Sequence, residues 1–78
     1  QTLGNARALG ISAALTGPVT RGDVGTLEAH LAALAAHAPD VVPLYRAAAM
    51  REIALSEERG ALTPDVSRRL RTALANTP

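Results

Sequence analysis

Apolar side chains recur at helical spacing in the middle of the chain. Intervals of three, four, three and four residues separate Val24, Leu27, Leu31, Leu34 and Ala38. This spacing places them on one face of a helix, and Asp23 stands directly before it as the expected N-cap. Its carboxylate should accept a hydrogen bond from the amide of Gly25 or Thr26. Pro39 ends the helix, because the residue before a proline avoids helical backbone angles.

The next helix is expected to begin after a cap at Asp40 and to run to about Arg59. Gly60 should end it in the left-handed conformation. Its apolar residues form two faces. One face consists of Val41, Leu44, Ala48 and Leu55, and the other of Val42, Tyr45, Ala49 and Ile53. We therefore expect this helix to be buried on more than one side.

The two ends of the chain complete the pattern. A last helix has Thr63 as its N-cap and Pro64 in its first turn, and it runs to about Ala75. A first helix covers residues 1–9, and a loop covers residues 10–22, because the Gly and Pro residues there stop helix propagation. The sequence therefore predicts an all-α fold, a compact bundle of about four helices in one domain over all 78 residues.

Composition supports helices but predicts a small core. Ala occurs 17 times and Leu 11 times, whereas Val and Ile together occur only seven times, which argues against a sheet. A single core in a domain of this size rarely supplies more than about 3–5 kcal/mol. We therefore expect the chain to form a homodimer or to pack on a neighbouring domain. Because it begins with Gln1 and not with Met, we expect it to be a fragment or a processed product of a longer chain.

Several classes of function are disfavoured. Without cysteine there is no disulfide and no thiol nucleophile. The apolar stretches are too short to span a membrane and no secretory signal pattern occurs, so we expect a cytoplasmic protein with no membrane partner. A net charge of +1 is not the basic footprint of a nucleic-acid-binding protein. His30 and His37 are seven residues apart, too far to share a metal ion, so no metal site is expected.

Two short motifs have functional interpretations that we do not favour. Residues 21–23 spell Arg-Gly-Asp, a cell-adhesion tripeptide, but three residues match by chance and Asp23 already serves as a helix cap. Residues 68–71 hold three arginines in a helix that follows a Gly60 turn, which would suit a helix-turn-helix DNA reader. Acidic residues lie just upstream and Lys is absent, so a solvated helix face is the favoured interpretation.

The segment from Leu15 to Asp23 is the most unusual part of the sequence. It concentrates hydroxyls, an arginine, glycines and an acid immediately before a helix N-terminus, which is a suitable place to hold a polar or anionic ligand. The candidate substrate-binding residues are Thr16, Arg21 and Asp23, followed by His30 and Tyr45. From spacing alone, a structural loop is favoured over a binding loop. A lone aromatic such as Tyr45 also usually packs in the core, with its hydroxyl reaching a partner.

Specific residues around this segment carry a family resemblance. They are Ala14-Leu15-Thr16-Gly17-Pro18, Arg21-Gly22-Asp23, Thr26, His30-Leu31, Leu34 and Pro43-Leu44-Tyr45-Arg46. From about Asn5 to Leu74 the chain resembles the helical domain called domain of unknown function 2520. In that family the domain follows a Rossmann-like domain that binds NAD or NADP.

The resemblance implies a fold and a role. Such proteins are similar to ketopantoate reductase, pyrroline-carboxylate reductase and 6-phosphogluconate dehydrogenase. The helical C-terminal domains of these enzymes often mediate dimerisation and close the substrate cleft. A 6-phosphogluconate dehydrogenase C-terminal-like fold is then expected, together with a role as the substrate-cleft and dimerisation domain of an NAD(P)-dependent oxidoreductase. The chain would then be the C-terminal part of a longer protein, would hold no cofactor-binding residue and would be inactive without its Rossmann domain.

One departure from the related dehydrogenases limits what is carried over. Several of them use a lysine near the substrate, and this chain has no lysine. Arg21 can bind a carboxylate or phosphate but is a poor proton donor, so the catalytic residues stay unknown. The alternative is a small helical protein-interaction module without catalytic role. A strand-GxGxxG-helix segment encoded upstream of Gln1 would distinguish the two.

Overall fold

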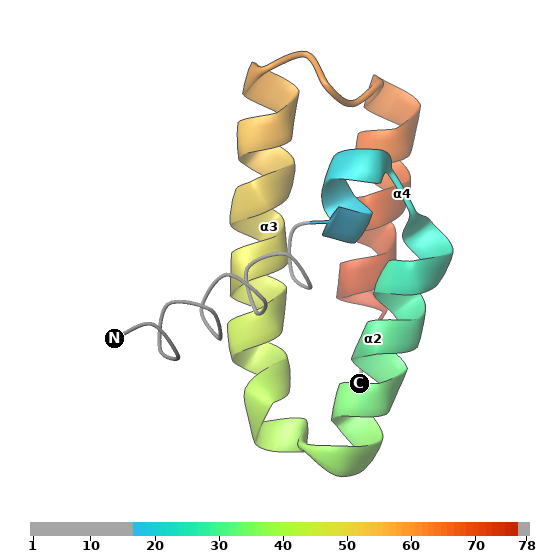
Figure 1. Cartoon of the computed structure of the whole chain (residues 1–78), viewed down its shortest axis with the longest axis vertical. Coiled ribbons are helices and arrows are strands. Elements are labelled where there is room, and N and C mark those ends of the chain that lie inside the picture. The colour runs from blue at the N-terminus through green and yellow to red at the C-terminus, as the bar shows by residue number, and fades with distance from the viewer. Residues whose placement is uncertain (1–16, 77–78) are drawn as a thin grey trace, which may run out of the picture.

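Three long helices lie side by side in the computed structural model, which describes residues 17–76 (Figure 1). A helical turn at residues 17–21 leads into α2 (Val24–His37), and the 3-10 helix η1 (Pro39–Val41) connects α2 to α3 (Val42–Glu58). The last helix is α4 (Pro64–Ala75). The turn between α2 and α3 and the turn between α3 and α4 lie at opposite ends of the bundle. This confirms the predicted all-α bundle, with no strand between residues 17 and 76.

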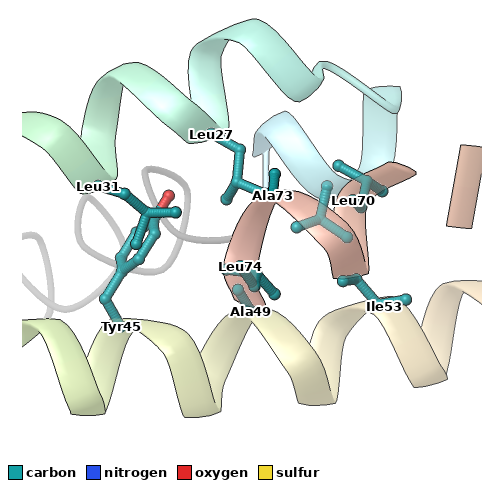
Figure 2. Packing of buried hydrophobic residues seen from close by; sticks show 9 residues of the cluster. Leu27, Leu31, Tyr45, Ala49, Ile53, Leu70, Ala73 and Leu74 are labelled. Carbon is teal, nitrogen blue, oxygen red and sulfur yellow. The ribbon is translucent and has the colours of Figure 1, made fainter. Parts of the chain in front are cut away.

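The core lies where α2, α3 and α4 meet (Figure 2). Its members are Val19 from the helical turn, Leu27 and Leu31 from α2, Tyr45, Ala49 and Ile53 from α3, and Leu70, Ala73 and Leu74 from α4. The ring of Tyr45 extends from α3 toward α2 and lies beside Leu31. Each helix therefore contributes one apolar stripe, and Tyr45 is the single aromatic ring among mostly aliphatic neighbours.

The predicted caps of α2 and α4 are confirmed. Asp23 Oδ1 accepts from the amide of Thr26 at 3.0 Å, and Thr63 Oγ1 accepts from the amide of Val66 at 3.2 Å. Each side chain satisfies an amide that has no partner inside its own helix. The starts of both helices follow from these two caps, as the sequence predicts.

The predicted loop at residues 10–22 is wrong in its described part. Residues 17–21 are helical, because this turn carries Val19 into the core, where it is fully buried. The turn ends at Gly22, whose amide donates to the carbonyl of Val19, while the amide of Asp23 donates to that of Pro18. These two bonds form a Schellman motif. Residues 10–16 and the predicted first helix lie outside the described residues.

The predicted cap of α3 is also wrong. Asp40 lies inside η1, and α3 follows Val41 without a side-chain cap. Pro39 is the physical reason, because its fixed φ angle starts a tight turn in which the Val42 amide donates to the Pro39 carbonyl. The start of α3 is therefore set by backbone geometry rather than by a capping carboxylate.

Only one of the two apolar faces of α3 is in the core, contrary to the expectation that both would be buried. Val42, Tyr45, Ala49 and Ile53 are buried. On the other face Leu44 is 70% exposed and Val41, which belongs to η1, is 37% exposed, while Ala48 and Leu55 are half-buried. The reason is geometric, since α2 and α4 both pack on the same side of α3 (Figure 1).

Two glycines have left-handed backbone angles that explain their positions. Gly22 has φ +67° and Gly60 has φ +70°, and Gly60 closes a second Schellman motif at the end of α3, as the sequence predicts. The two sites differ in their surroundings. A Cβ on Gly22 would stand 2.8 Å from Val66 Cγ1 on α4, whereas a Cβ on Gly60 would meet nothing within 4 Å.

We predict that alanine is tolerated worse at Gly22 than at Gly60. Gly60→Ala should lower the free energy of unfolding by about 1–2 kcal/mol through left-handed strain alone. Gly22→Ala should lower it by roughly a further 1–3 kcal/mol, because the new methyl group displaces Val66. Urea denaturation of both variants measures the difference. In a Val66→Ala background the excess cost at Gly22 should disappear, and equal costs of both alanines in the unaltered chain would contradict the prediction.

Candidate functional site

Arg21 and Asp23 lie at the junction between the helical turn and α2. Arg21 is the last helical residue of the turn, and its guanidinium folds back over Gly17, where a Cβ would lie 3.1 Å from Nη1. Its Nη2 is 4.0 Å from Asp23 Oδ2. The Arg21 side chain is 63% exposed, so this ion pair is a weak, solvated one. The absence of a side chain on Gly17 is therefore what lets the guanidinium lie against the turn.

The carboxylate of Asp23 is held by Thr26. Besides accepting from the Thr26 amide, it accepts from the Thr26 hydroxyl through Oδ2 at 2.7 Å. These hydrogen bonds, helped by the charge of Arg21, hold the pKa of Asp23 below its ordinary value of 3.8. Both oxygens are thus engaged at the start of α2. Asp23 therefore acts as a helix cap, which leaves Arg21 as the group at this junction that is able to bind a ligand.

His30 and Tyr45 come together across α2 and α3. His30 Nδ1 is 3.1 Å from the Tyr45 hydroxyl oxygen, and the rings meet edge to face at a centroid distance of 6.1 Å and an angle of 74°. Tyr45 is 4% exposed, whereas His30 is half-buried. Burial raises the pKa of the Tyr45 phenol, so the phenol is neutral near pH 7. The prediction that Tyr45 packs in the core with its hydroxyl on a partner is confirmed.

These two pairs form a polar strip along α2, which we define as Arg21, Asp23, His30 and Tyr45. Seven residues of α-helix separate Asp23 from His30, a rise of roughly 10 Å. The two pairs interact electrostatically, because the charge of His30 contributes to lowering the pKa of Asp23. Four of the five predicted site residues thus lie on one strip. Thr16, the fifth, lies outside the described residues.

Thr26 is a member of this region that was not predicted as a site residue. Its amide was an expected partner of Asp23, but its hydroxyl binds the same carboxylate. An Asp followed three residues later by a hydroxyl-bearing side chain resembles the capping pattern in which both side chains meet at a helix start. That spacing, Asp23 to Thr26, is the signal that would have identified it.

Grooves occur elsewhere on the described surface, away from the polar strip. One of about 530 Å³ lies between α3 and α4, and one of about 350 Å³ lies between α2 and α4. The first is lined by Glu57, Pro64, Ser67, Arg68, Arg71, Thr72 and Ala75. The lining of both grooves contains none of the predicted site residues. The strip is therefore not the wall of either groove.

Two of the three arginines of α4, Arg68 and Arg71, are paired with carboxylates of the chain, and Arg69 is exposed. Arg68 pairs with Asp65, and Arg71 Nη2 lies 2.7 Å from Glu57 Oε1. The hydrogen bond from Arg71 also lowers the pKa of the Glu57 carboxyl. The cluster therefore presents little net charge to a DNA backbone, which supports the solvated-face interpretation.

Residues 17–76 contain neither a metal-binding cluster nor a helix able to cross a membrane. No three His, Asp or Glu side chains in this range lie close enough together to hold a metal ion. No helix in the same range has the length and apolar character that crossing a membrane requires.

We predict that Asp23 makes stability depend on pH at the acid end. Its folded-state pKa is lowered, so its stabilisation is complete above pH 3.8 and is lost as the pH falls through the folded-state pKa. Asp23→Asn keeps a capping side chain but removes this titration. Thermal melts between about pH 2 and 6 should show a shallower loss of Tm for Asp23→Asn than for the unaltered chain.

Glu57→Gln supplies a second, independent variant for the same measurement. The pKa of Glu57 is also lowered, by the hydrogen bond from Arg71. Its effect should add to that of Asp23→Asn, because the two sites share no partner. If the loss of Tm at low pH is the same in Asp23→Asn as in the unaltered chain, the carboxylate of Asp23 does not hold the start of α2.

Comparison with known proteins gives one match. No curated protein and no solved structure matches the chain. A family model described as "Domain of unknown function (DUF2520)" matches residues 1–52, which is two-thirds of the 78 residues. All five predicted site residues fall inside the match, and α4 falls outside it. The chain therefore belongs to the DUF2520 family.

Proposed function

We propose that this chain is the substrate-cleft and dimerisation domain of an NAD(P)-dependent oxidoreductase and is inactive alone. The observation that carries the proposal is the polar strip, in which an exposed guanidinium before the start of α2 and a histidine–tyrosine pair between α2 and α3 lie along α2. A guanidinium binds carboxylate or phosphate, and an imidazole or phenol exchanges hydrogen bonds with a carbonyl or hydroxyl group. These are the groups that a substrate of such an enzyme would present.

Membership of the family supports the same role. The resemblance implies a Rossmann-like domain before this one in the complete protein, which would bind NAD or NADP. Neither of the two grooves described above is lined by the strip, and in the complete protein a separate domain would supply the opposite wall of a cleft. The nicotinamide would come from that domain, and Arg21 would bind an anionic group of the substrate.

The exposed apolar face of α3 supports the dimerisation part of the proposal. Leu44 is 70% exposed, and Val41, three residues earlier at the end of η1, is 37% exposed. Large apolar side chains that lie close together on an exposed surface are typical of a protein-contact surface. The same observation favours the second candidate, a protein-interaction module without catalysis. The two candidates differ in whether the polar strip binds a substrate.

We predict that Arg21 controls substrate binding in the complete protein encoded by the gene. Arg21→Ala should raise KM for the substrate at least tenfold, leave NAD(P)H affinity nearly unchanged and barely alter Tm, because the side chain is exposed. Arg21→Lys should restore binding only in part, since an ammonium group lacks the bidentate geometry. Arg69→Ala is the matched control, an exposed arginine on α4.

Two outcomes would contradict this proposal. A complete gene without a strand-GxGxxG-helix segment upstream of residue 1 would remove the oxidoreductase and leave the interaction module. A large loss of Tm in Arg21→Ala with unchanged KM would show that Arg21 holds the turn instead of a substrate.

We also predict that the exposed face of α3 mediates self-association. Leu44→Asp should shift the sedimenting species toward monomer without lowering Tm, because Leu44 lies outside the core. Ala29→Asp, an equally simple change at an exposed position of α2, is the control and should leave the species unchanged. A chain that sediments as a monomer at all concentrations before substitution would contradict this prediction.

A further inference from the structure

The buried hydroxyl of Tyr45 has a fixed position. Its ring lies in the core beside Leu31 and is 4% exposed, so the ring has little freedom to move (Figure 2). Its hydroxyl lies 3.1 Å from Nδ1 of His30. A phenol whose pKa is raised by burial keeps its proton and therefore has a hydrogen to donate.

Two arrangements of protons satisfy this contact. In one, Tyr45 donates to a bare Nδ1, and the imidazole carries its proton on Nε2. In the other, an Nδ1–H donates to the tyrosine oxygen, and the phenol hydrogen must find another acceptor. Among residues 17–76, His30 is the only hydrogen-bond partner of this hydroxyl. A buried donor without an acceptor is costly, so the first arrangement is favoured.

The remaining nitrogen of His30 faces elsewhere. The two ring nitrogens point in diverging directions, so Nε2 points away from Tyr45 when Nδ1 points toward it. His30 is half-buried, and its Nδ1 edge lies against a buried side chain. Within residues 17–76 Nε2 makes no hydrogen bond and is not one of the buried polar atoms that lack a partner, so it is the edge of His30 that a ligand can reach.

We propose that Tyr45 is a positioning residue that holds His30 in the Nε2–H tautomer, so that His30 offers an N–H donor to an acceptor oxygen of a ligand. The ligand chemistry is a carboxylate or carbonyl oxygen, which accepts such a bond. The identification of that ligand as the substrate rests on the proposed function, whereas the tautomer itself does not. Tyr45 touches no ligand in this scheme and acts through His30.

The tautomer is measured by long-range ¹H–¹⁵N NMR of the 78-residue chain, at a pH at which an imidazole is neutral. We expect a bare Nδ1 and a protonated Nε2 in His30 of the unaltered chain. Tyr45→Phe keeps the ring in the core but removes the hydroxyl, so the Nδ1–H tautomer should then become detectable. His37, exposed at the end of α2, is the internal control and should not respond.

Two results would overturn the tautomer assignment. One is a proton on Nδ1 of His30 in the unaltered chain. The other is the same tautomer population in the unaltered chain and in Tyr45→Phe, with Tm values showing that both are folded. Neither result depends on whether the chain belongs to an oxidoreductase.

The ligand contact is tested with sodium acetate as the probe, against sodium chloride at equal ionic strength. We expect a saturable shift of the His30 Nε2 resonance that is at least several-fold weaker in affinity in Tyr45→Phe. No saturable shift, or equal affinity in both proteins, would overturn the contact. If the tautomer is confirmed but Arg21→Ala leaves KM unchanged in the complete protein, the proposed function fails and the role of Tyr45 stands.

Discussion

The left-handed turn at Gly22 is the constraint on which the strip depends. With φ +67° and no side chain, Gly22 lets the helical turn at residues 17–21 end and α2 begin within two residues, while its backbone lies against Val66 of α4. A residue with a Cβ would meet Val66 Cγ1 at 2.8 Å. The same turn places Val19 in the core and Arg21 at the surface. The conformation of Gly22 therefore determines which of these two side chains is buried.

Packing between α2 and α3 then positions the second half of the strip. Pro39 turns the chain tightly through η1, and the two helices return alongside each other with Leu31 beside Tyr45 (Figures 1 and 2). Because Tyr45 is the single aromatic of the chain, its reach from α3 to α2 brings its polar end to His30. A shorter side chain at this position would leave His30 without a buried partner.

The regular parts of the fold could be predicted from the sequence, and the junctions could not. Asp23 and Thr63 lie directly before periodic apolar stripes, so a local rule located the starts of α2 and α4. The helical state of residues 17–21 depends on burying Val19 in a core built by distant helices, which no local pattern contains. Asp40 failed as a cap because Pro39 imposes a backbone geometry that overrides the preference of an acidic side chain. For the site, the choice of Arg21, His30 and Tyr45 came from residue type, but the His30–Tyr45 contact needed the α2–α3 packing.

The match to the family model ends at residue 52, and the parts of the chain before and after this residue have different roles in the structure. Residues 1–52, which match the family model, contain every residue of the polar strip and most of the exposed apolar face of α3. The α4 helix lies beyond the match, yet it supplies Leu70, Ala73 and Leu74 to the core, and its Leu74 carbonyl accepts from Arg46 Nε of α3 at 3.2 Å. Two of its arginines, Arg68 and Arg71, form ion pairs within the chain. The α4 helix therefore supports α2 and α3 by packing against both, and within residues 17–76 Leu44 of α3 stays exposed, as a contact with a second copy would require.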